Sequence, residues 1–569
     1  MSSDRARASN RERQAAPRRY EGRAGRSVGA PAGAGRRAHG WLTYPAAVPL
    51  PPSARWLTLV FAAAGGFFTR LAFPDPGWSL LAPVGVTLLY LALRRDSARW
   101  NALVGLVWGL TCFGPMITWA DEAVGLVPWL ALTVLEASYV ALFGAAWAWA
   151  RRGHAVWRGG FWQLLVFVVL WVGVEELRSS WPFGGFPWGR LAFSQADSPL
   201  AAFMWVGGTP LLSAVVAGLG VLLARAALAA GQVAFVRTVG ALAAVGAVVA
   251  GSLVIPLDTA AQTGTLRVGA VQGNVPEPGR LDAFGQRRQV LDNHVAGTRA
   301  LLERTAPGDL DVVLWPENGS DIDPQVDAEA AGLIDGVAQE VAAPLLVGTV
   351  QYPDSGGRYN TAVLWEPGVG PVATYSKQRP APFAEYIPMR SFVRHFSDAV
   401  DLVTRDMLPG TKPGVIPLAS ERLGRTVVLG DVICFEVAYD AIVREAVTEG
   451  GELLVVQTNN ASFGWSDEST QQLAMARLRA VELGRATVQI STVGVSAVIA
   501  PNGVVTQRTE LFTADQMIAD LPLRDSLTPA ARAGDWPARV ACVLAVCVVL
   551  AGMVGAARLR RDDRPEGPA

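Results

Sequence analysis

The stretch GDVICFEVAY at residues 430–439 places one cysteine, Cys434, between an apolar run and an acidic residue, Glu436. The run before Cys434 is short, apolar and rich in β-branched residues, which is typical of a buried strand. A cysteine in a strand usually packs as a small apolar side chain. A thiol becomes a nucleophile when a base or a cation helps it to lose its proton. The rest of the chain decides between these two interpretations.

The composition indicates a membrane protein. Of 569 residues, 51% are hydrophobic and only 17% are charged, whereas soluble domains carry about 25% charged residues. The first forty residues are rich in Arg, Gly and Ala and nearly lack large apolar side chains. Such a segment buries too little apolar surface to offset its ordering entropy. We expect residues 1–54 to be a disordered Arg-rich tail that helps to set topology, with an anionic-lipid contact as the alternative.

Eight apolar stretches approach the roughly 20 residues that a helix needs to cross a bilayer. They lie at residues 56–73, 78–93, 102–119, 124–150, 159–174, 200–223, 238–256 and 540–557. Seven of them precede a more polar block and one follows it. The sequence therefore predicts a seven-helix transmembrane domain at 55–257, a separate domain at 264–525, a final transmembrane helix at 536–558 and a tail at 559–569.

The charges of the connections predict the orientation. Connections 94–99 and 151–158 are Arg-rich, whereas connections 74–77 and 121–125 contain no Lys or Arg. The fifth connection, with Arg178 and Arg190, is an exception. Positively charged connections stay in the cytoplasm, so both termini are predicted to be cytoplasmic and block 264–525 extracytoplasmic. The expected location is a plasma membrane, which the chain crosses as a multi-pass protein.

The outer block alternates strand-like and helix-like segments. Short β-branched, apolar runs lie at 266–275, 310–318, 343–352, 360–368, 425–436 and 452–460. Helical patterns lie at 285–303, 327–341 and 468–484. Strands alternating with helices favour a layered α/β domain around a buried sheet.

Cys434 is the only cysteine of the outer block, because Cys112, Cys542 and Cys547 lie in predicted spans. Charged residues in two other segments could support it. Glu317 follows an apolar run in LWPEN (314–318), and Lys377 and Glu385 lie in the proline-rich loop YSKQRPAPFAEYIP (375–388). Each could also be an ordinary surface charge.

The three residue types together suit acyl transfer by a cysteine. A carboxylate whose pKa is raised by burial can accept the thiol proton, and a lysine can stabilise an oxyanion. A Cys/His pair using His294 or His395 stays open, although neither histidine follows a predicted strand as Glu317 does. No cysteine spacing of the zinc-binding type is present, and no metal or cofactor is expected.

The ordered motifs WPEN, YSKQRPAPFAEYIP and GDVICFE resemble the nitrilase (carbon–nitrogen hydrolase) superfamily. With the surrounding spans, residues 55–557 resemble the bacterial apolipoprotein N-acyltransferase family. VQGNVPE (271–277), YNTAVLWEP (359–367) and residues 475–503 share this likeness. The resemblance implies an αββα sandwich for the outer domain.

The resemblance also implies residue roles. Glu317 corresponds to the general base, Lys377 to the lysine and Cys434 to the nucleophile of a Glu-Lys-Cys triad. Supporting or substrate-binding roles are implied for Glu385, Tyr386, Phe435, Glu436 and, in the loop GFPW (185–188), Trp188. Phe435 stands where the family often has Tyr, Ala384 where it often has Gly, and QRP after Lys377 where it more often has a stretch containing His. These departures put in doubt only a role for a hydroxyl at position 435.

The implied reaction moves an acyl chain from a phospholipid to Cys434, as a thioester, and then to the α-amine of a diacylglyceryl-modified apolipoprotein. No nucleic acid is involved. One alternative is a membrane-tethered amidase or nitrilase, which shares the triad but needs water as acceptor and does not explain eight spans. The other is a non-catalytic membrane scaffold, against which the intact Glu/Lys/Cys set argues.

Four more residues lie near predicted outer helix ends. Trp78 and Trp119 are interpreted as interfacial anchors. Glu175 and Glu176 are expected in the headgroup region, with a cavity-facing position as the alternative.

Overall fold

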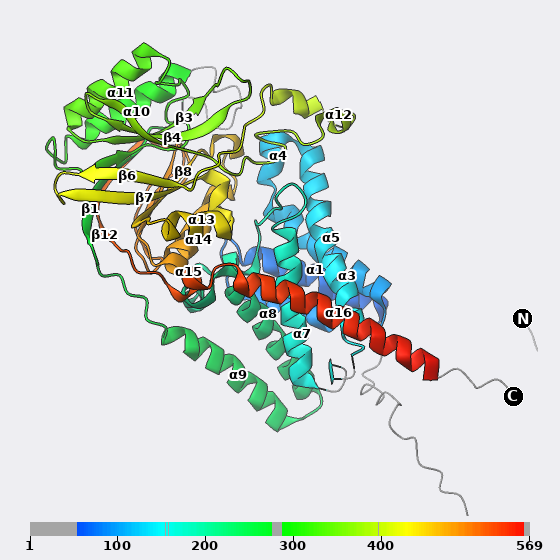
Figure 1. Cartoon of the computed structure of the whole chain (residues 1–569). Coiled ribbons are helices and arrows are strands. Elements are labelled where there is room, and N and C mark those ends of the chain that lie inside the picture. The colour runs from blue at the N-terminus through cyan, green and yellow to red at the C-terminus, as the bar shows by residue number, and fades with distance from the viewer. Residues whose placement is uncertain (1–53, 154, 157–158, 276–286, 397, 563–569) are drawn as a thin grey trace, which may run out of the picture. The chain divides into compact units, whose positions relative to one another are not determined.

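The computed structural model describes residues 54–153, 155–156, 159–275, 287–396 and 398–562 (Figure 1). Of the predicted tails, residues 1–53 and 563–569 lie outside the described residues, whereas residues 559–562 continue the helix at Trp536–Asp562. Residues 276–286, which include the start of the helical pattern predicted at 285–303, also lie outside the described residues.

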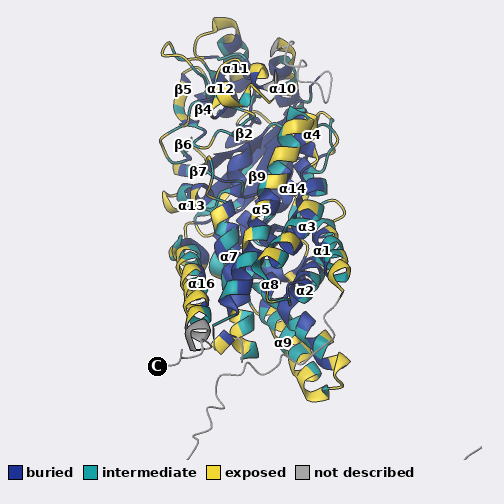
Figure 2. Ribbon diagram, turned by 90° about the vertical axis from the view of Figure 1, so that its right-hand side faces the viewer, coloured by how far each residue is buried: buried dark blue, intermediate teal, exposed yellow. Residues whose placement is uncertain are grey.

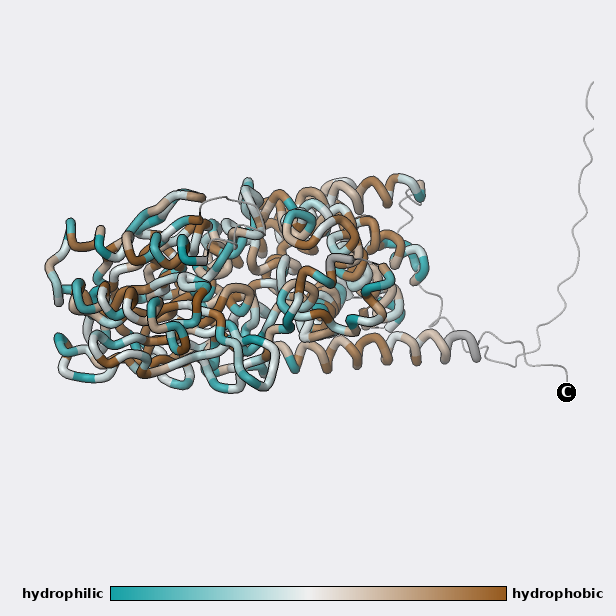
Figure 3. Tube along the Cα trace, turned by 90° about the horizontal axis from the view of Figure 1, so that it is seen from above, coloured by the Kyte–Doolittle hydropathy of each residue, from teal (hydrophilic) through white to brown (hydrophobic). Residues whose placement is uncertain are grey.

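A helix lies at each of the eight apolar stretches. These are α1 (Arg55–Leu71), α2 (Leu81–Ala92), α3 (Ala98–Met116), α5 (Leu126–Ala150), α7 (Gly160–Arg178), α8 (Phe203–Gly231), α9 (Phe235–Leu253) and α16 (Trp536–Asp562). Among the described residues, five helical segments are long and apolar enough to cross a membrane, namely 126–150, 160–178, 199–231, 235–253 and 536–557. The helical bundle is predominantly hydrophobic, with hydrophilic residues towards helix ends (Figure 3). The number of spans and their orientation stay predictions.

Small residues let the bundle helices approach closely. A Cβ atom added at Gly105 of α3 would lie 2.1 Å from the carbonyl oxygen of Val140 in α5, and one at Gly144 of α5 would lie 2.1 Å from that of Asn101 in α3. The two backbones therefore touch at two levels. Close contact through glycines compensates for the weak hydrophobic drive between helices in lipid.

The second part of the chain contains two mixed sheets, each with six strands among the described residues. The first has the order β12-β1-β2-β3-β4-β5 and the second the order β11-β10-β9-β8-β7-β6. Strands of the first sheet are β1 (Gly264–Gln272), β2 (Val312–Leu314), β3 (Leu345–Gln351), β4 (Tyr359–Glu366), β5 (Gly370–Ser376) and β12 (Asp515–Leu523). Strands of the second are β6 (Val415–Ser420), β7 (Arg425–Ile433), β8 (Leu453–Thr458), β9 (Thr487–Ser491), β10 (Ala497–Ile499) and β11 (Val505–Arg508).

Helices cover the outer faces of the two sheets (Figure 1). On the first sheet, α10 (Arg287–Leu301) and α11 (Ala328–Val341) bury an apolar stripe that includes Ile334 and Val337. On the second lie α13 (Asp440–Thr448) and α14 (Glu468–Leu483). A separate core between the sheets joins Leu266 and Val268 of β1 to Val455 of β8. The predicted αββα sandwich is confirmed.

The sheet topology brings two strand ends to one edge. Strands β1, β2 and β3 are parallel, and so are β7, β8 and β9. The carboxyl ends of parallel strands meet at one edge of a sheet, where sites commonly form. Glu317 lies three residues after β2, and Cys434 directly follows β7. The fold thus places both side chains at the strand ends that face each other across the sandwich.

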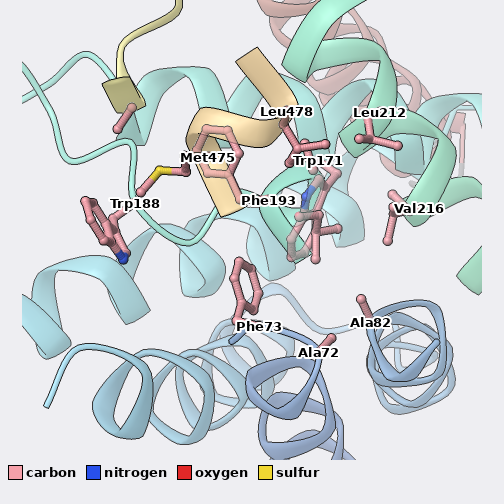
Figure 4. Packing of buried hydrophobic residues seen from close by; sticks show 14 of the residues in the cluster. Ala72, Phe73, Ala82, Trp171, Trp188, Phe193, Leu212, Val216, Met475 and Leu478 are labelled. Atoms are coloured by element: carbon pink, nitrogen blue, oxygen red, sulfur yellow. The ribbon is translucent and has the colours of Figure 1, made fainter. Parts of the chain in front are cut away.

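One hydrophobic core runs from the bundle into the sandwich. Met475 and Leu478 of α14 pack in one cluster with Trp171 of α7, Leu212 of α8 and Phe193, which lies in the short 3₁₀ helix η1 (Leu191–Gln195) (Figure 4). Buried residues continue from the helices into the second sheet, whereas α9 and α16 expose much of their surface (Figure 2). The bundle therefore serves as the second sheet's outer layer together with α13 and α14.

Candidate active site

Cys434 lies on a tight turn between β7 and the short 3₁₀ helix η5 (Cys434–Ala438). Its φ of 55° is in the left-handed region, which costs a residue with a Cβ about 1–3 kcal/mol and is tolerated where neighbours enforce it. Cys434 is 7% exposed. Its thiol is within hydrogen-bonding reach of Glu317 and of Thr458 at the end of β8.

Glu436 fixes this turn. Its side chain is fully buried and accepts four hydrogen bonds. The donors are the Ile433 amide at 2.8 Å, the Tyr375 hydroxyl at 2.8 Å, and the amides of Gln378 and Arg379 at 2.6 Å and 3.1 Å. One carboxylate therefore joins the cysteine turn to the segment that follows Lys377.

Glu317 is buried beside the thiol. Its Oε2 accepts a hydrogen bond from the amide of Asn459 at 2.7 Å, and its Oε1 accepts one from Asn360 Nδ2 at 2.5 Å. The ammonium of Lys377 lies 3.6 Å from Oε1. These contacts hold the carboxylate rigidly while leaving it able to accept the Cys434 proton.

Lys377 lies between two carboxylates. Its Nζ donates to Glu385 Oε1 at 2.9 Å, and Glu385 Oε2 accepts from the Ala381 amide at 2.6 Å. Burial by itself lowers the pKa of Lys377, but the charges of Glu385 and Glu317 outweigh this and hold it well above its usual value. The lysine is therefore a fixed cation at the site.

Burial and charge set the resting state of Cys434 and Glu317. Burial raises the pKa of the Cys434 thiol, the Glu317 carboxylate raises it further, and Lys377 lowers it. Burial also raises the pKa of Glu317, opposed by Lys377 and reinforced by Glu385. The cysteine thus rests as a thiol next to a carboxylate whose basicity exceeds that of an ordinary glutamate.

An aromatic cluster adjoins the nucleophile. Phe435 stacks on Trp188 with ring centroids 4.7 Å apart, and Trp119 packs edge-on against Trp188 at 5.2 Å. Trp188 Nε1 donates to Gln471 Oε1 of α14 at 2.6 Å. The ring of Phe435 therefore stacks on Trp188, and this stacking does not require a hydroxyl at position 435.

Tyr386, the remaining predicted site residue, is half-buried in the loop after Glu385. Its carbonyl accepts a hydrogen bond from the Phe383 amide at 2.8 Å. Burial raises the pKa of its hydroxyl, and Arg379 opposes this shift. Tyr386 is therefore placed at the rim of the site and not in its centre.

An apolar cavity of about 410 Å³ reaches the aromatic cluster. Its walls come from α4 (Trp119–Val124), α5, the loop before Trp188, and the active-site loop with the short helix α12 (Arg390–Val393). It ends at Phe435 and Ala384, the chain neighbours of Cys434 and Glu385. The cavity thus lies between the bundle and the aromatic cluster beside Cys434.

Sequence reasoning missed several residues of the site. Asn360 holds Glu317, Tyr375 holds Glu436, and Gln471 holds Trp188. Glu468 of α14 is fully buried near Cys434, and burial raises the pKa of Glu468 to about 8. Polar residues inside the apolar patterns YNTAVLWEP and ESTQQLAM were the available signal for Asn360 and Gln471.

The structure gives protein partners to residues at the outer helix ends and corrects the interpretation of Trp119. Glu175 and Glu176 both pair with Arg190, which is 2% exposed, and their place in the headgroup region stays a prediction. Trp119 is buried at 5% exposure within the aromatic cluster, whereas Trp78 is 59% exposed. Trp119 is covered by the sandwich, since its Nε1 donates to Gln471 Oε1 of α14 at 3.4 Å, whereas the partner of Glu175 and Glu176 comes from the loop after α7.

The histidines make other contacts. His294 Nδ1 donates to the Val290 carbonyl at 2.7 Å and its Nε2 accepts from the Gly273 amide at 3.2 Å. His395 is exposed and bonds to the Ser391 carbonyl at 2.8 Å. Neither contacts Cys434 among the described residues, so the geometry favours Glu317 as its base.

Both parts of the chain, the helical bundle and the sandwich, are similar to known proteins. A family model described as the apolipoprotein N-acyltransferase N-terminal domain matches residues 65–222, and one described as carbon-nitrogen hydrolase matches residues 267–527. The chain is similar to an apolipoprotein N-acyltransferase of Mycolicibacterium smegmatis, with 37% identity over 87% of this chain and 85% of the relative. The chain is also similar to an apolipoprotein N-acyltransferase of Azotobacter vinelandii, with 30% identity over 90% of this chain and 99% of the relative.

The sandwich is also similar to the crystal structure of an amidase from Nesterenkonia sp. (20% identity, TM-score 0.35, 49% of this chain and 96% of that chain). That score is low, and the assignment does not depend on it. The chain matches two family models in the expected order. It also matches relatives over most of their length. These two findings together identify its family. The chain belongs to the apolipoprotein N-acyltransferase family.

Proposed function

We propose that this chain transfers an acyl group from a membrane phospholipid to the α-amine of a diacylglyceryl-modified apolipoprotein, through a thioester on Cys434. The observation that carries the proposal is the convergence of Cys434, Glu317 and Lys377 from three separate strand ends beside an apolar cavity.

In the first step, Glu317 accepts the thiol proton and the Cys434 sulfur attacks the ester carbonyl of the phospholipid. The oxyanion that forms lies against the Lys377 ammonium and a backbone N–H next to Cys434. Collapse of the tetrahedral intermediate breaks the ester bond. The lysophospholipid alkoxide leaves with the proton that Glu317 held, and the acyl chain stays on sulfur.

In the second step, the α-amine of the apolipoprotein attacks the thioester carbonyl, and Glu317 accepts a proton from it. The same cation stabilises the second oxyanion. The C–S bond breaks, the thiolate takes the proton back from Glu317, and an amide remains on the lipoprotein. Glu385 and Glu436 act as positioning residues in both steps, through Lys377 and through the cysteine turn.

A membrane donor suits the surroundings of the triad. The cavity that reaches Phe435, the chain neighbour of Cys434, is apolar and partly walled by helices of the bundle, which suits an acyl chain held next to the triad. Exposing each CH₂ of such a chain costs about 0.8 kcal/mol. We place the catalytic domain on the extracytoplasmic side and both termini in the cytoplasm, on the distribution of arginines.

The decisive experiment is mass spectrometry of a lipoprotein N-terminus from cells with and without this protein. The proposal expects an N-acyl group only in cells with the protein, and its loss on Cys434→Ala at normal membrane levels. N-acylation that persists with Cys434→Ala would refute the proposal and favour a scaffold role. Release of free fatty acid in place of N-acylation would favour the hydrolase.

A further inference from the structure

A second and larger cavity lies on the other side of the catalytic turn. It has a volume of about 1180 Å³ and is bounded by α5, α7, the start of α8 and α16. Its long walls are apolar, with Ala146, Leu170, Val174, Val543 and Val549 among the residues that form them. We refer to this cavity as the α16 groove. It contains none of the residues of the Glu-Lys-Cys triad.

The end of the groove nearest the sandwich is cationic. Arg444 and Arg539 both pair with Asp535, so two guanidinium groups share one carboxylate. Arg379 is exposed and makes no side-chain hydrogen bond or ion pair with any other described residue. Arg379, Arg444, Arg539 and Asp535 together form the rim and carry a net positive charge.

The other charged side chains that line the groove all have partners. Glu176 and Asp440 pair with the buried Arg190, and Asp440 and Glu482 pair with the buried Arg479. These groups form a network of three carboxylates and two guanidinium groups beneath the rim. Among the described residues that line the groove, Arg379 is therefore the charged side chain without a partner.

A thin wall separates the groove from the catalytic cavity. Tyr439 lines both, and its hydroxyl donates to the Gly185 carbonyl at 3.0 Å. Gly184 faces the groove and Gly185 faces the catalytic cavity. The same segment that bears Arg379 gives its backbone amide to Glu436, which fixes the cysteine turn. The cationic rim is thus connected directly to the catalytic centre.

An apolar groove along membrane helices that ends at a cationic rim, with Arg379 unpaired among the described residues, matches one class of ligand. Guanidinium groups bind phosphate through two parallel hydrogen bonds, and acyl chains fill apolar grooves between helices. We propose that the α16 groove is a second lipid site, which holds a glycerophospholipid with its phosphate at Arg379 and Arg444 and its acyl chains along α16. This goes beyond the proposed function, because it concerns occupancy and not turnover.

The test uses the full chain with Cys434→Ala in vesicles that contain phosphatidylglycerol and a phosphatidylglycerol with a photoreactive diazirine in one acyl chain. Adducts are mapped by mass spectrometry after illumination. The proposal expects adducts on groove residues of α16, such as Val543 and Val549, and a fall of about tenfold in their yield with Arg379→Gln plus Arg444→Gln, as for the loss of one charge-assisted hydrogen bond. Adducts on the exposed helix α9 report lipid that merely surrounds the protein and should not change.

Two controls keep the result interpretable. Arg379→Gln alone removes no internal side-chain contact, so it tests the rim without risk to folding, and Arg532→Gln replaces an exposed arginine of α15 (Pro529–Ala533) that does not line the groove. Groove adducts that are insensitive to the rim substitutions would mark surrounding lipid and overturn the proposal. Millimolar inorganic phosphate should lower the groove adducts, because it competes with the lipid phosphate for the same guanidinium groups, and groove adducts that phosphate leaves unchanged would contradict the assigned headgroup contact. Because Cys434 is absent, neither outcome depends on acyl transfer.

Discussion

The proton of Cys434 has one strong acceptor within reach, and that acceptor is tuned by its neighbours. Burial raises the pKa of Glu317, Lys377 lowers it and Glu385 raises it again. A more basic carboxylate accepts a thiol proton more readily. The rate should therefore depend on the ionised form of Glu317 and should fall as pH drops through a value above that of an ordinary glutamate.

Replacing Glu385 tests this tuning. Glu385→Gln removes a negative charge that raises the pKa of Glu317 and leaves Lys377 to interact with Glu317 alone, so both effects lower that pKa. We expect the acid limb of the kcat/KM profile to move to lower pH, while the maximal rate falls because Lys377 is less well held. The profile is measured as the rate of N-acylation of a lipopeptide between about pH 4 and pH 9, which includes ordinary and raised carboxylate pKa values.

Glu445→Gln is the matched control. Glu445 of α13 accepts a hydrogen bond at 3.0 Å from Nε2 of Gln378, which lies in the same loop as Glu385, but Glu445 does not contact Lys377. Its substitution should leave the acid limb in place. An acid limb that stays fixed or moves upward in Glu385→Gln would contradict the assignment of Glu317 as the base.

Among the structural elements, the cysteine turn and the loop after β5 depend on one shared carboxylate. Glu436→Gln replaces one acceptor oxygen by an NH₂ group, which would face amide or hydroxyl donors and leave them unsatisfied at about 1–3 kcal/mol each. We expect kcat to fall about tenfold to a hundredfold with little change in KM, because the groups that move act on the transition state. Steady-state kinetics at equal membrane levels measure this. A raised KM with an unchanged kcat would show instead that Glu436 acts in binding.

The packing of α10 against β1 predicts a pH-dependent stability. Burial lowers the pKa of His294 to about 4, from an ordinary value of 6.5, against the hydrogen bond to Val290. As pH falls from 6.5 to 4, the imidazole of His294 therefore becomes protonated in the unfolded chain but stays largely neutral in the folded chain. This contributes a loss of about 3 kcal/mol in the free energy of unfolding over that range.

Thermal or denaturant unfolding of the detergent-solubilised protein at several pH values measures the effect. His294→Gln keeps a polar group but cannot titrate, so its stability should fall less between pH 6.5 and pH 4 than that of the parent. Parallel curves for parent and variant would contradict the assigned protonation state.

Some elements were predictable from the sequence and others were not, for physical reasons. Strands β3, β4 and β8 are buried on both faces, so their sequences are predominantly apolar, and this pattern predicts buried strands. The three-residue strand β10 is too short to show a period, and β12 mixes exposed and buried positions. The αββα order and the residues at strand ends follow from local patterns. The register that brings Asn360 to Glu317 depends on how β4 pairs with its neighbours, and no local pattern encodes it.

In the whole molecule, bundle and sandwich are joined by buried charges. Asp440 of α13 pairs with Arg190 of the loop after α7 at 2.9 Å and with Arg479 of α14 at 2.7 Å. Asp440 and Arg190 are 250 residues apart in the chain. Sequence patterns could locate each charge but could not pair them, since the partners come from different domains. The pairing of Glu175 and Glu176 with Arg190 was likewise not predicted from the sequence.

Removing the shared carboxylate should destabilise the whole assembly. Asp440→Asn leaves two buried arginines with fewer counter-charges, which costs about 3 kcal/mol where a buried pair is broken. Asp197→Asn is the control, because Asp197 also joins the bundle to Arg477 of α14 but is 57% exposed, and a surface pair contributes at most about 1 kcal/mol. Thermal unfolding in detergent should show a clear fall only for Asp440→Asn. Equal falls for both variants would contradict the role of the buried network.

The central claim, that the sulfur of Cys434 carries the acyl chain, is tested most directly by mass spectrometry of the purified protein after incubation with phospholipid and no lipoprotein. The account predicts one acyl group on the peptide that contains Cys434, labile to hydroxylamine, discharged when a diacylglyceryl-cysteine peptide with a free α-amine is added, and missing from Cys434→Ala. A folded protein that N-acylates lipoprotein without ever carrying this thioester, or that carries the acyl group on another residue, would contradict it.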